Sequence, residues 1–395
     1  MRKSKFLLLM MSLMVVFALS AAGCKSNSSS DKGEGTLALY LTDAATENYK
    51  AVYVSIGEVY VHAKGDSELE DGWQIVATPN KTYNLLELVN GVMEELGVTD
   101  LETGSYSQLR MILSKTPDNG DNILGIKHKY PNYIITSDDE EIPLKVPSGY
   151  QTGIKLVSGF DIIKGQTLEL VLDFDASRSV VKAGTSGKYL LKPTIKVIES
   201  MNNPYVEGWV TNKEGGIQGA IVSAQIFYPQ ENGAGETVEV YTSTLTDERG
   251  FYLMYLPSGE YNIVAYRSPG EASGPAFGPG CEWIDASGNL GYEADFVLEE
   301  NVTGSLDVRV TLEEGQTVSI SALKSAQCNG QETEIEVAHM GLGSDENGQS
   351  VIDINGVMVL PVGKYTIVAK TQEIEFVKTV VIKETTKLVV FDFTS

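Results

Sequence analysis

Three places in this chain carry the same turn pattern, and this repetition constrains the fold more than any other feature. Leu256–Ala265 and Leu360–Ala369 share the pattern L-P-x-G-x-Y-x-I-V-A, and Leu101–Tyr106 repeats its core, L-x-x-G-x-Y. The leucine anchors the end of one strand, the glycine permits the turn, and the tyrosine opens the next strand with its ring inward and its hydroxyl free to bond the backbone. Comparable tyrosine corners recur in β-sandwiches, so the pattern predicts repeated sandwich units.

A second motif follows each turn in the same order. Thr167–Phe174 and Thr386–Phe393 match as T-x-x-x-V-x-D-F, and Asp295-Phe296 supplies the Asp-Phe pair between them. Apolar residues alternate from Gly35 onward, which is typical of half-buried strands. We therefore expect a mainly β chain of tandem β-sandwich domains of Greek-key type. The expected domains are residues 35–200, 201–300 and 301–395.

One stretch within the first domain is ambiguous. The apolar residues of Tyr83–Leu96 are spaced so that a short helix is allowed, whereas Asn90-Gly91 in the middle favours a turn. Both alternatives stay open at this point.

The N-terminus has the form of a bacterial lipoprotein signal. The basic segment Met1–Lys5 precedes the apolar run Phe6–Ala22, and Ala21-Ala22-Gly23-Cys24 resembles a lipobox, with alanine where leucine is commonest. We interpret residues 1–23 as a cleaved signal peptide and Cys24 as the lipidation site that ties the chain to a membrane. An uncleaved anchor is the alternative, but the run is at the short end of the about 17 to 25 residues that a span needs. A plain secretory signal is the other alternative.

Residues 24–34 form a polar, serine-rich segment that cannot bury enough apolar surface to order itself, so we expect a flexible tether. Lys25 stands where an aspartate retains lipoproteins at the inner membrane of some Gram-negative bacteria. The expected location is therefore the cell envelope, with the outer membrane favoured and the domains facing either the periplasm or the cell surface.

The charge balance excludes some partners. The chain has 30 Lys and Arg against 53 Asp and Glu, a net charge of −23, and the signal segment contributes only basic residues. Such a surface repels nucleic acid and anionic lipid head groups, so no nucleic-acid partner is expected.

The first domain resembles the lipoprotein-associated family called domain of unknown function 4382. The likeness is carried by Thr36–Ala44, Val52–Ile56, Pro147–Leu156 and Leu172–Ala176. The resemblance implies an envelope location and assigns no chemistry.

The second domain resembles the carboxypeptidase regulatory-like domain, from Tyr205 to about Glu300. The motifs that carry the likeness are Val206–Val210, Gly216–Val222, Thr246–Tyr252 and Leu256–Tyr261. The resemblance implies a small prealbumin-like sandwich, grouped with carbohydrate-binding-like folds, and no catalytic role. The chain departs from the family at Tyr228–Thr237 and Ser268–Gly280, and the third domain matches neither family.

Motifs of catalysis are missing from the sequence. It has no His-Glu-x-x-His, nucleophile elbow or phosphate loop, and Gly184–Lys188 is better explained as the tip of a hairpin. Of its three histidines, His62 continues an expected strand and His128 lies between two lysines, so both are predicted to be surface residues rather than ligands. The chain is therefore predicted not to be an enzyme.

Acidic loops make calcium the one cofactor to weigh. Carboxylate oxygens are the ligands that Ca²⁺ prefers, and the chain offers Asp138–Glu141, Asp173 with Asp175, Asp247-Glu248 and Asp345–Asn347. Turn capping by aspartate explains such positions equally well. We expect no cofactor, with calcium as the alternative and no residue assigned to it.

Cys281 and Cys328 are the remaining cysteines. In an oxidising envelope they can pair and join the second domain to the third, or they can stay as two separate thiols. Neither alternative is favoured by the sequence.

Binding is the functional class that remains. Tryptophan rings stack on sugars, and Trp283, beside a Gly/Pro-rich loop, is the candidate stacking residue, whereas Trp209 lies on an expected strand and is assigned to the core. The leading interpretation is a non-enzymatic envelope lipoprotein whose sandwich modules bind polysaccharide or an envelope protein. The alternatives are a structural spacer or assembly subunit, and an accessory subunit of a surface enzyme complex.

Overall fold

The computed structural model describes residues 33–394, apart from 45, 47, 66–71, 147–152, 185–186, 200–203, 229–236, 269–274, 289–290 and 345–350. The signal segment, Cys24 and the acidic stretch at 345–347 lie outside the described residues. Glu34–Ser395 forms one compact unit, separate from Met1–Gly33. The helical elements with described bounds are the 3-10 turn η2 (Leu85–Glu87) and α1 (Ala176–Ser179), and strands make up most of the rest, so the prediction of a mainly β chain is confirmed.

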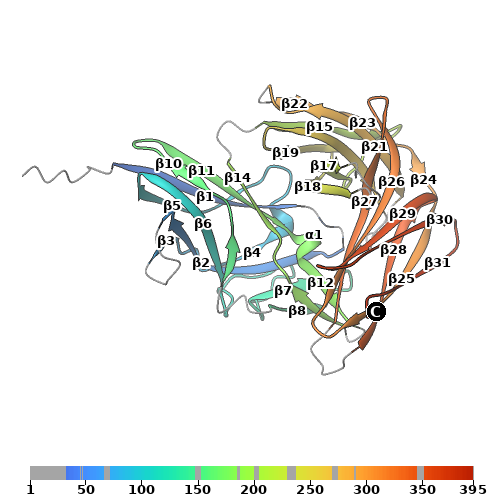
Figure 1. The fold of residues 1–395 in the computed structure, drawn as a ribbon, viewed down its shortest axis with the longest axis horizontal. Coiled ribbons are helices and arrows are strands. Elements are labelled where there is room, and N and C mark those ends of the chain that lie inside the picture. The colour runs from blue at the N-terminus through green and yellow to red at the C-terminus, as the bar shows by residue number, and fades with distance from the viewer. Residues whose placement is uncertain are drawn as a thin grey trace, which may run out of the picture. The chain divides into compact units, whose positions relative to one another are not determined.

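One arrangement of strands occurs three times along the chain and can be followed by colour in Figure 1. In each repeat, the first strand pairs antiparallel with the strand that precedes the tyrosine corner and parallel with the closing strand. The three sheets are β5 (Glu94–Glu102), β1 (Glu34–Ala44) and β11 (Thr167–Asp175); β19 (Phe251–Tyr255), β15 (Tyr205–Asn212) and β23 (Phe296–Val297); and β28 (Val351–Pro361), β25 (Thr303–Glu313) and β31 (Lys387–Asp392).

The second sheet of each repeat is built around the strand that follows the corner, which pairs antiparallel with the second strand of the repeat. These pairs are β6 (Gly104–Leu113) with β2 (Ala51–Ala63), β20 (Glu260–Arg267) with β17 (Ile221–Tyr228), and β29 (Gly363–Lys370) with β26 (Thr317–Cys328). The same connection from one sheet to the other is therefore made at the same motif three times.

The other strands extend these sheets or pair at their margins. In the first repeat they are β3 (Trp73–Ala77), β4 (Lys81–Asn84), β7 (Asn132–Ile135), β8 (Glu141–Lys145), β9 (Ile154–Leu156), β10 (Phe160–Ile162), β12 (Val180–Ala183), β13 (Lys188–Leu191) and β14 (Ile195–Glu199). Later in the chain they are β16 (Gly215–Gly216), β18 (Thr237–Leu245), β21 (Ala276–Asp285), β22 (Gly291–Glu293), β24 (Glu300–Asn301), β27 (Gln331–Gly343) and β30 (Glu375–Ile382).

Each repeat encloses its own apolar core between its two sheets. The alternation along the first strands explains why. In β25, Leu306, Val308, Val310 and Leu312 are at most 1% exposed, while their neighbours face outward. Each such side chain contributes about 1.5 to 3 kcal/mol on burial. The phenylalanine of every Asp-Phe pair is also buried, so the closing strand completes the core.

The tyrosine corners form as the motif predicts. The hydroxyl of Tyr106 donates to the carbonyl of Glu102 at 3.1 Å. The Tyr365 hydroxyl does the same to Pro361 at 2.7 Å, and Tyr261 donates to the carbonyl of Pro257 at 3.1 Å. All three rings are buried. The hydroxyl thus ties the turn to the start of the following strand in every repeat.

The ambiguous stretch at Tyr83–Leu96 contains a turn and only one turn of 3-10 helix. Asn90 and Gly91 have φ values of 60° and 75°, in the left-handed region that ends a right-handed helix. The chain then enters β5. The turn alternative is therefore correct.

The first and third repeats share a sheet, a pairing that no sequence motif predicts. Strand β12 pairs in parallel with β27, with Lys182 opposite Leu342 and Ala183 opposite Gly343. This pairing joins the second sheets of the two repeats into one continuous sheet of 14 strands. The repeats are consequently coupled by backbone hydrogen bonds as well as by side chains.

Candidate binding site

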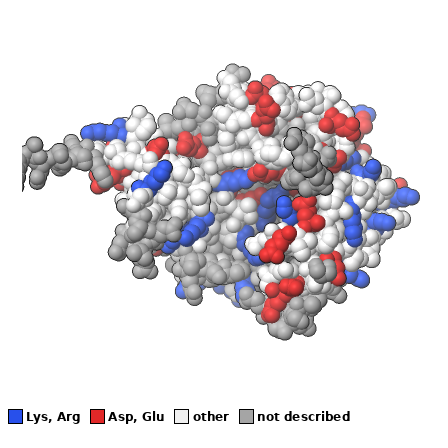
Figure 2. Space-filling view, in the orientation of Figure 1, with Lys and Arg blue, Asp and Glu red and all other residues white. Residues whose placement is uncertain are grey.

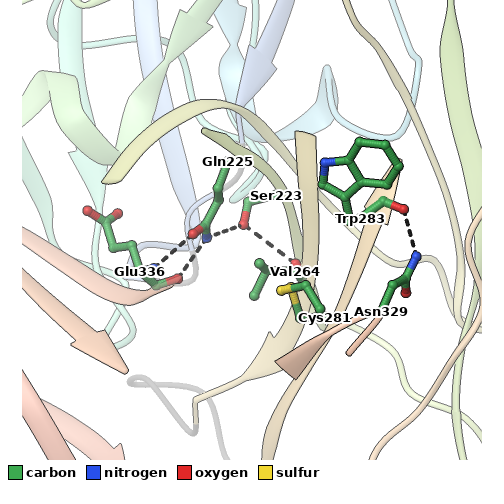
Figure 3. Close-up of a disulfide and its surroundings, with 8 residues drawn as sticks. Ser223, Gln225, Val264, Cys281, Trp283, Asn329 and Glu336 are labelled. Carbon is green, nitrogen blue, oxygen red and sulfur yellow. Dashed lines mark hydrogen bonds between the residues drawn. A yellow bond between two sulfur atoms is a disulfide. The ribbon is translucent and has the colours of Figure 1, made fainter. Parts of the chain in front are cut away.

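Trp283 lies on β21, an outer strand of the second repeat, and 38% of its surface is exposed. Its main-chain carbonyl accepts a hydrogen bond of 2.9 Å from Nδ2 of Asn329, in the turn between β26 and β27. Figure 3 shows this bond at the backbone of Trp283, so the indole itself does not take part in it. The site therefore combines an exposed ring with an anchored main chain.

The other two tryptophans have cations over their rings. The guanidinium carbon of Arg110 lies 3.9 Å from the ring centroid of Trp73, and that of Arg249 lies 5.6 Å from the centroid of Trp209. Within the described residues, no cation or aromatic ring is placed in this way over Trp283. Trp283 is thus an exposed tryptophan with no such contact to its ring within the described residues.

The assignment of Trp209 to the core is wrong. Trp209 is on a strand, as expected, but 39% of its surface is exposed. Val206, Gly208 and Val210 occupy the buried face of β15, so the alternation turns Trp209 outward. In a strand that is buried on one face, only every second side chain points into the core, and Trp209 is at a position that points to solvent.

Cys281 and Cys328 are joined in a disulfide, with their Cα atoms 4.9 Å apart. The bond connects β21 of the second repeat to the end of β26 in the third, close to Trp283 (Figure 3). Closing a loop with a sequence separation of 47 residues removes conformational entropy from the unfolded chain, which corresponds to about 4 kcal/mol in the loop-closure model.

A buried ion pair connects the first repeat to the third. The guanidinium of Arg178 in α1 contacts the carboxylate of Glu336 in β27, and Glu336 is 5% exposed. The second carboxylate oxygen of Glu336 accepts a hydrogen bond of 2.7 Å from Ser321, and Arg178 lies 3.4 Å from a carboxylate oxygen of Asp175. Both charged groups therefore have partners, which buried charges require.

The second repeat reaches the same point through Gln225. Its side-chain amide donates to the main-chain carbonyl of Glu336 and accepts from the main-chain N–H, both at 2.8 Å, as Figure 3 shows. Gln225 is 1% exposed. The amide thus pairs with both main-chain groups of Glu336, as the backbone of a neighbouring strand would. With Arg178 from the first repeat, residues from all three repeats meet at Glu336.

Two cavities border the ion pair. One, of about 410 Å³, is lined by residues of all three repeats, including Tyr49, Tyr266 and His339. The other is about 380 Å³, and Arg178 and Glu336 line both. On the face shown in Figure 2, acidic and basic side chains are interspersed with uncharged surface, so no patch of one sign dominates it.

The predicted surface position of His62 and His128 is wrong. His62 is 3% exposed and its ring centroid lies 5.0 Å from that of Trp73. The side chain of His128 is 4% exposed, and its Nδ1 is 2.8 Å from the hydroxyl of Tyr133. Both rings pack against aromatic neighbours, an environment that flanking lysines in the sequence do not reveal.

Several of the acidic residues considered for calcium have other roles. Oδ1 of Asp247 accepts the main-chain N–H groups of Arg249 and Phe251, and Asp139 pairs with Lys50 at 2.7 Å. Asp175 caps α1. Within the described ranges, no group of three or more His, Cys, Asp or Glu side chains converges as metal ligands would.

Asp173 is the most unusual of these carboxylates. It is 3% exposed, and its Oδ1 has no hydrogen-bond partner among the described residues. Burial raises the pKa of the carboxyl to about 7, against the opposing effect of a hydrogen bond from Thr242 and the charge of Lys196. The position thus favours the protonated acid.

No helix in the described part of the chain is long and apolar enough to cross a membrane.

Fold and site define a class: a chain of tandem β-sandwich repeats with an exposed tryptophan and a polar junction. The family model for the domain of unknown function DUF4382 matches residues 34–193, which make up most of the first repeat. This match confirms the resemblance found for the first repeat. No curated protein matches the sequence.

Several solved structures are similar to the chain in outline. The Bacillus anthracis TIE protein is 16% identical, with 91% of this chain and 50% of that chain covered and a TM-score of 0.18. A leucine-rich repeat protein from Bacteroides thetaiotaomicron is 13% identical, with 48% of this chain and 26% of that chain covered and a TM-score of 0.23. A streptococcal ancillary pilin is 11% identical, with 91% of this chain and 98% of that chain covered and a TM-score of 0.20. This chain thus spans about half of the first protein and about a quarter of the second. Similarities of this degree do not bear on activity or partners.

Proposed function

We propose that this chain is a non-enzymatic lipoprotein of the bacterial envelope whose repeats form a rigid body that presents Trp283 to envelope polysaccharide. The lipobox at Cys24 supports the anchor, and the match to residues 34–193 supports the assignment of the first repeat. The resemblance of the second repeat to carboxypeptidase regulatory-like domains supports a binding role, because that family is grouped with carbohydrate-binding-like folds.

The observation that carries the proposal is the exposed side chain of Trp283 on a strand that is held by a disulfide and a hydrogen bond. The Cys281–Cys328 disulfide holds the main chain two residues before Trp283, and the hydrogen bond from Asn329 holds the carbonyl of Trp283 itself. A ring held in place loses little conformational entropy when a ligand stacks on it, so more of the contact energy is available for affinity. Aromatic faces with polar surroundings suit sugar rings.

Co-sedimentation with purified envelope polysaccharide tests this proposal, with calcium and with chelator in parallel. The protein is the soluble unit 34–395, which contains nearly every described residue. Trp283→Ala is expected to weaken binding about tenfold, as the loss of about 1.4 kcal/mol of stacking would. Trp209→Ala is the matched control, because Trp209 is 39% exposed and Trp283 38%. Equal effects of the two substitutions, or no binding by the unchanged protein, would contradict the proposal.

A structural spacer or assembly subunit is the second candidate. The meeting of all three repeats at Glu336 and the disulfide between the second and third favour it, because a spacer must hold its length under load. This candidate predicts no saturable polysaccharide binding and a protein partner that is recovered by cross-linking in cells. An accessory role in a surface enzyme complex predicts instead that a catalytic protein co-purifies.

The anchor is tested separately. Replacing Cys24 with serine removes the thiol that lipidation requires, so the protein is expected to leave the membrane fraction. If the Cys24→Ser protein remained bound through a carbonate wash, the lipoprotein assignment would be wrong.

A further inference from the structure

We propose that two copies of this chain pair edge to edge through β30, antiparallel and with Thr379 of each copy at the twofold axis. Strand β30 is the last strand at one end of the 14-stranded sheet, and in the described part of the chain it pairs with β29 alone. The outer edge of such a strand presents main-chain N–H and C=O groups that a further strand can bind. The strand belongs to the third repeat, so this contact does not depend on polysaccharide binding at Trp283.

Strand β30 lacks the features that usually keep an edge strand from pairing, which are proline, bulges and like charges. It contains no proline or glycine, and its ladder with β29 continues without a register shift from Glu375 to Ile382. The edge strand β5 is different. Its ladder with β1 has a register shift, and it carries four carboxylates that would repel a second copy, those of Glu94, Glu95, Asp100 and Glu102.

The solvated face of β30 exposes two valines beside the free edge. Val377 is 47% exposed and Val381 is 53% exposed, whereas Val380 and Ile382 are buried. This alternation is typical of a strand with one solvated face, but the side chains on that face are partly apolar. Covering them stabilises a pair by about 25 cal/mol for each Å² of apolar surface that is removed from water.

Antiparallel pairing about Thr379 matches the side chains of the two copies. Opposite residues place their side chains on the same face of a sheet, so Val377 of one copy lies opposite Val381 of the other. At the ends of the pair, the exposed Glu375 lies opposite the exposed Lys383. Since the arrangement has twofold symmetry, both of these pairs form twice.

Other positions of the axis match the side chains less well. An axis between two residues would place the buried face of one strand opposite the solvated face of the other. An axis at Lys378 places two lysines opposite each other, and an axis at Val380 places Lys383 opposite Val377. An axis at Val377 leaves Val381 beyond the end of the partner strand. Apolar and opposite-charge pairs each contribute about 0.2 to 1 kcal/mol, whereas like charges directly opposite destabilise the pair.

The charged side chains of β30 do not obstruct this pairing. The ammonium of Lys378 donates to the carbonyl of Val390 and lies 4.8 Å from the ring centroid of Phe391, so it is held against β31 of its own copy. Glu375 contacts Lys370 at 3.4 Å, with 28% and 55% of their side chains exposed. Exposed ion pairs contribute at most about 1 kcal/mol, so Glu375 can exchange this lysine for one of the second copy.

Cysteine cross-linking of the full chain in detergent tests the pairing and its register. Thr379→Cys places one thiol of each copy at the axis. Residues directly opposite each other in an antiparallel pair have Cα atoms about 4.5 to 5.5 Å apart, which suits a disulfide. After mild oxidation, non-reducing electrophoresis is expected to show a covalent dimer as the major species.

Two other cysteine substitutions are matched controls. Val377→Cys is on the same strand, but the two thiols would be four residues apart along the pair, or about 13 Å, which a disulfide cannot span. Leu388→Cys is on β31, and Leu388 is 50% exposed, so it reports random collisions of an equally exposed thiol. Each control is expected to give at least tenfold less covalent dimer than Thr379→Cys.

Sedimentation equilibrium of the full chain without added cysteines tests the pairs at the ends. Glu375→Lys and Lys383→Glu each place like charges opposite each other at both ends, so each should raise the dissociation constant of the dimer about tenfold. The chain with both substitutions has opposite charges again, and its constant should return to within about twofold of that of the unchanged protein. The contact of Glu375 with Lys370 is lost in the single and in the double variant alike, so it does not explain a rescue.

Three results would overturn this pairing. They are the absence of a covalent dimer with Thr379→Cys, cross-linking by Val377→Cys or Leu388→Cys to the same extent, and a double charge exchange that does not restore the dimer. None of them bears on polysaccharide binding, which Trp283→Ala tests in a different repeat.

Discussion

Asp173→Asn is expected to stabilise this protein by an amount that grows as the pH rises from about 4 and reaches its full value above about pH 7. The carboxyl is buried on β11 opposite Lys196 of β14, with one oxygen unpartnered among the described residues. Burial raises its pKa to about 7, and the neighbouring charge of Asp175 adds to the effect. Asparagine has nearly the same shape and cannot ionise, so the substitution removes the cost of a buried charge without leaving a cavity.

The sign and size follow from linkage. An unfolded aspartate has a pKa of about 3.9, so the folded chain holds this proton more tightly than the unfolded chain does. The contribution of Asp173 to stability is therefore greatest below about pH 4, and it falls as the pH rises towards 7. Three pKa units at 1.36 kcal/mol each give about 4 kcal/mol, which is the most that Asp173→Asn can recover at pH 8. Near pH 4 the substitution should be almost neutral.

The measurement is urea unfolding at a series of pH values between 4 and 8, followed by tryptophan fluorescence. Asp285→Asn is the control, because Asp285 is exposed and hydrogen bonds to Ser287 lower its pKa, so its replacement gives no gain at pH 8. Burial raises the pKa of Asp43 as well, and the charge of Asp173 raises it further, so Asp173→Asn also relieves part of the shift at Asp43 and the two gains have the same sign. A difference between Asp173→Asn and the unchanged protein that stayed constant across the pH series would refute the reasoning.

Three further predictions concern contacts within or between the repeats, and a fourth concerns calcium. Arg178→Met leaves the charge of Glu336 buried and unpaired, so the free energy of unfolding should fall by about 3 kcal/mol in the same urea assay. Tyr365→Phe removes one corner hydrogen bond, and a loss of about 1 kcal/mol is expected by thermal melting. Reducing the Cys281–Cys328 disulfide should cost up to about 4 kcal/mol, measured with and without dithiothreitol. Calcium and chelator are expected to give the same melting temperature, and a shift with calcium would revive a metal site.

Local motifs allowed the repeats to be predicted because the corner is a short-range structure. The leucine, glycine and tyrosine lie within six residues, and the tyrosine hydroxyl reaches back only four residues, from Tyr365 to Pro361. The closing Asp-Phe motif could also be recognised, because its phenylalanine fills the core in each of the three repeats and the same residue type therefore recurs. In both motifs, the residues that form the structure lie close together in the sequence.

The junction could not be predicted in this way. The pairing of β12 with β27 joins residues far apart in sequence, and nothing in either strand alone specifies the other. Glu336 lies between Ile335 and Val337, where an isolated charge in a strand is usually read as solvent-facing. Its burial depends on Arg178 and Gln225, which come from two other repeats. A charged residue inside an apolar strand was the available signal, but it does not identify its partner.

The residues that join the first and third repeats also form part of the wall of the cavity of about 410 Å³. Arg178 and Glu336 line the cavity while they hold the first repeat against the third. A ligand that contacts walls from all three repeats binds only the assembled arrangement, so it must stabilise that arrangement by its binding free energy. At one hundred times its dissociation constant the gain is about 2.7 kcal/mol, nearly the amount that Arg178→Met is expected to remove. Any ligand of this cavity would therefore be coupled to the integrity of the junction.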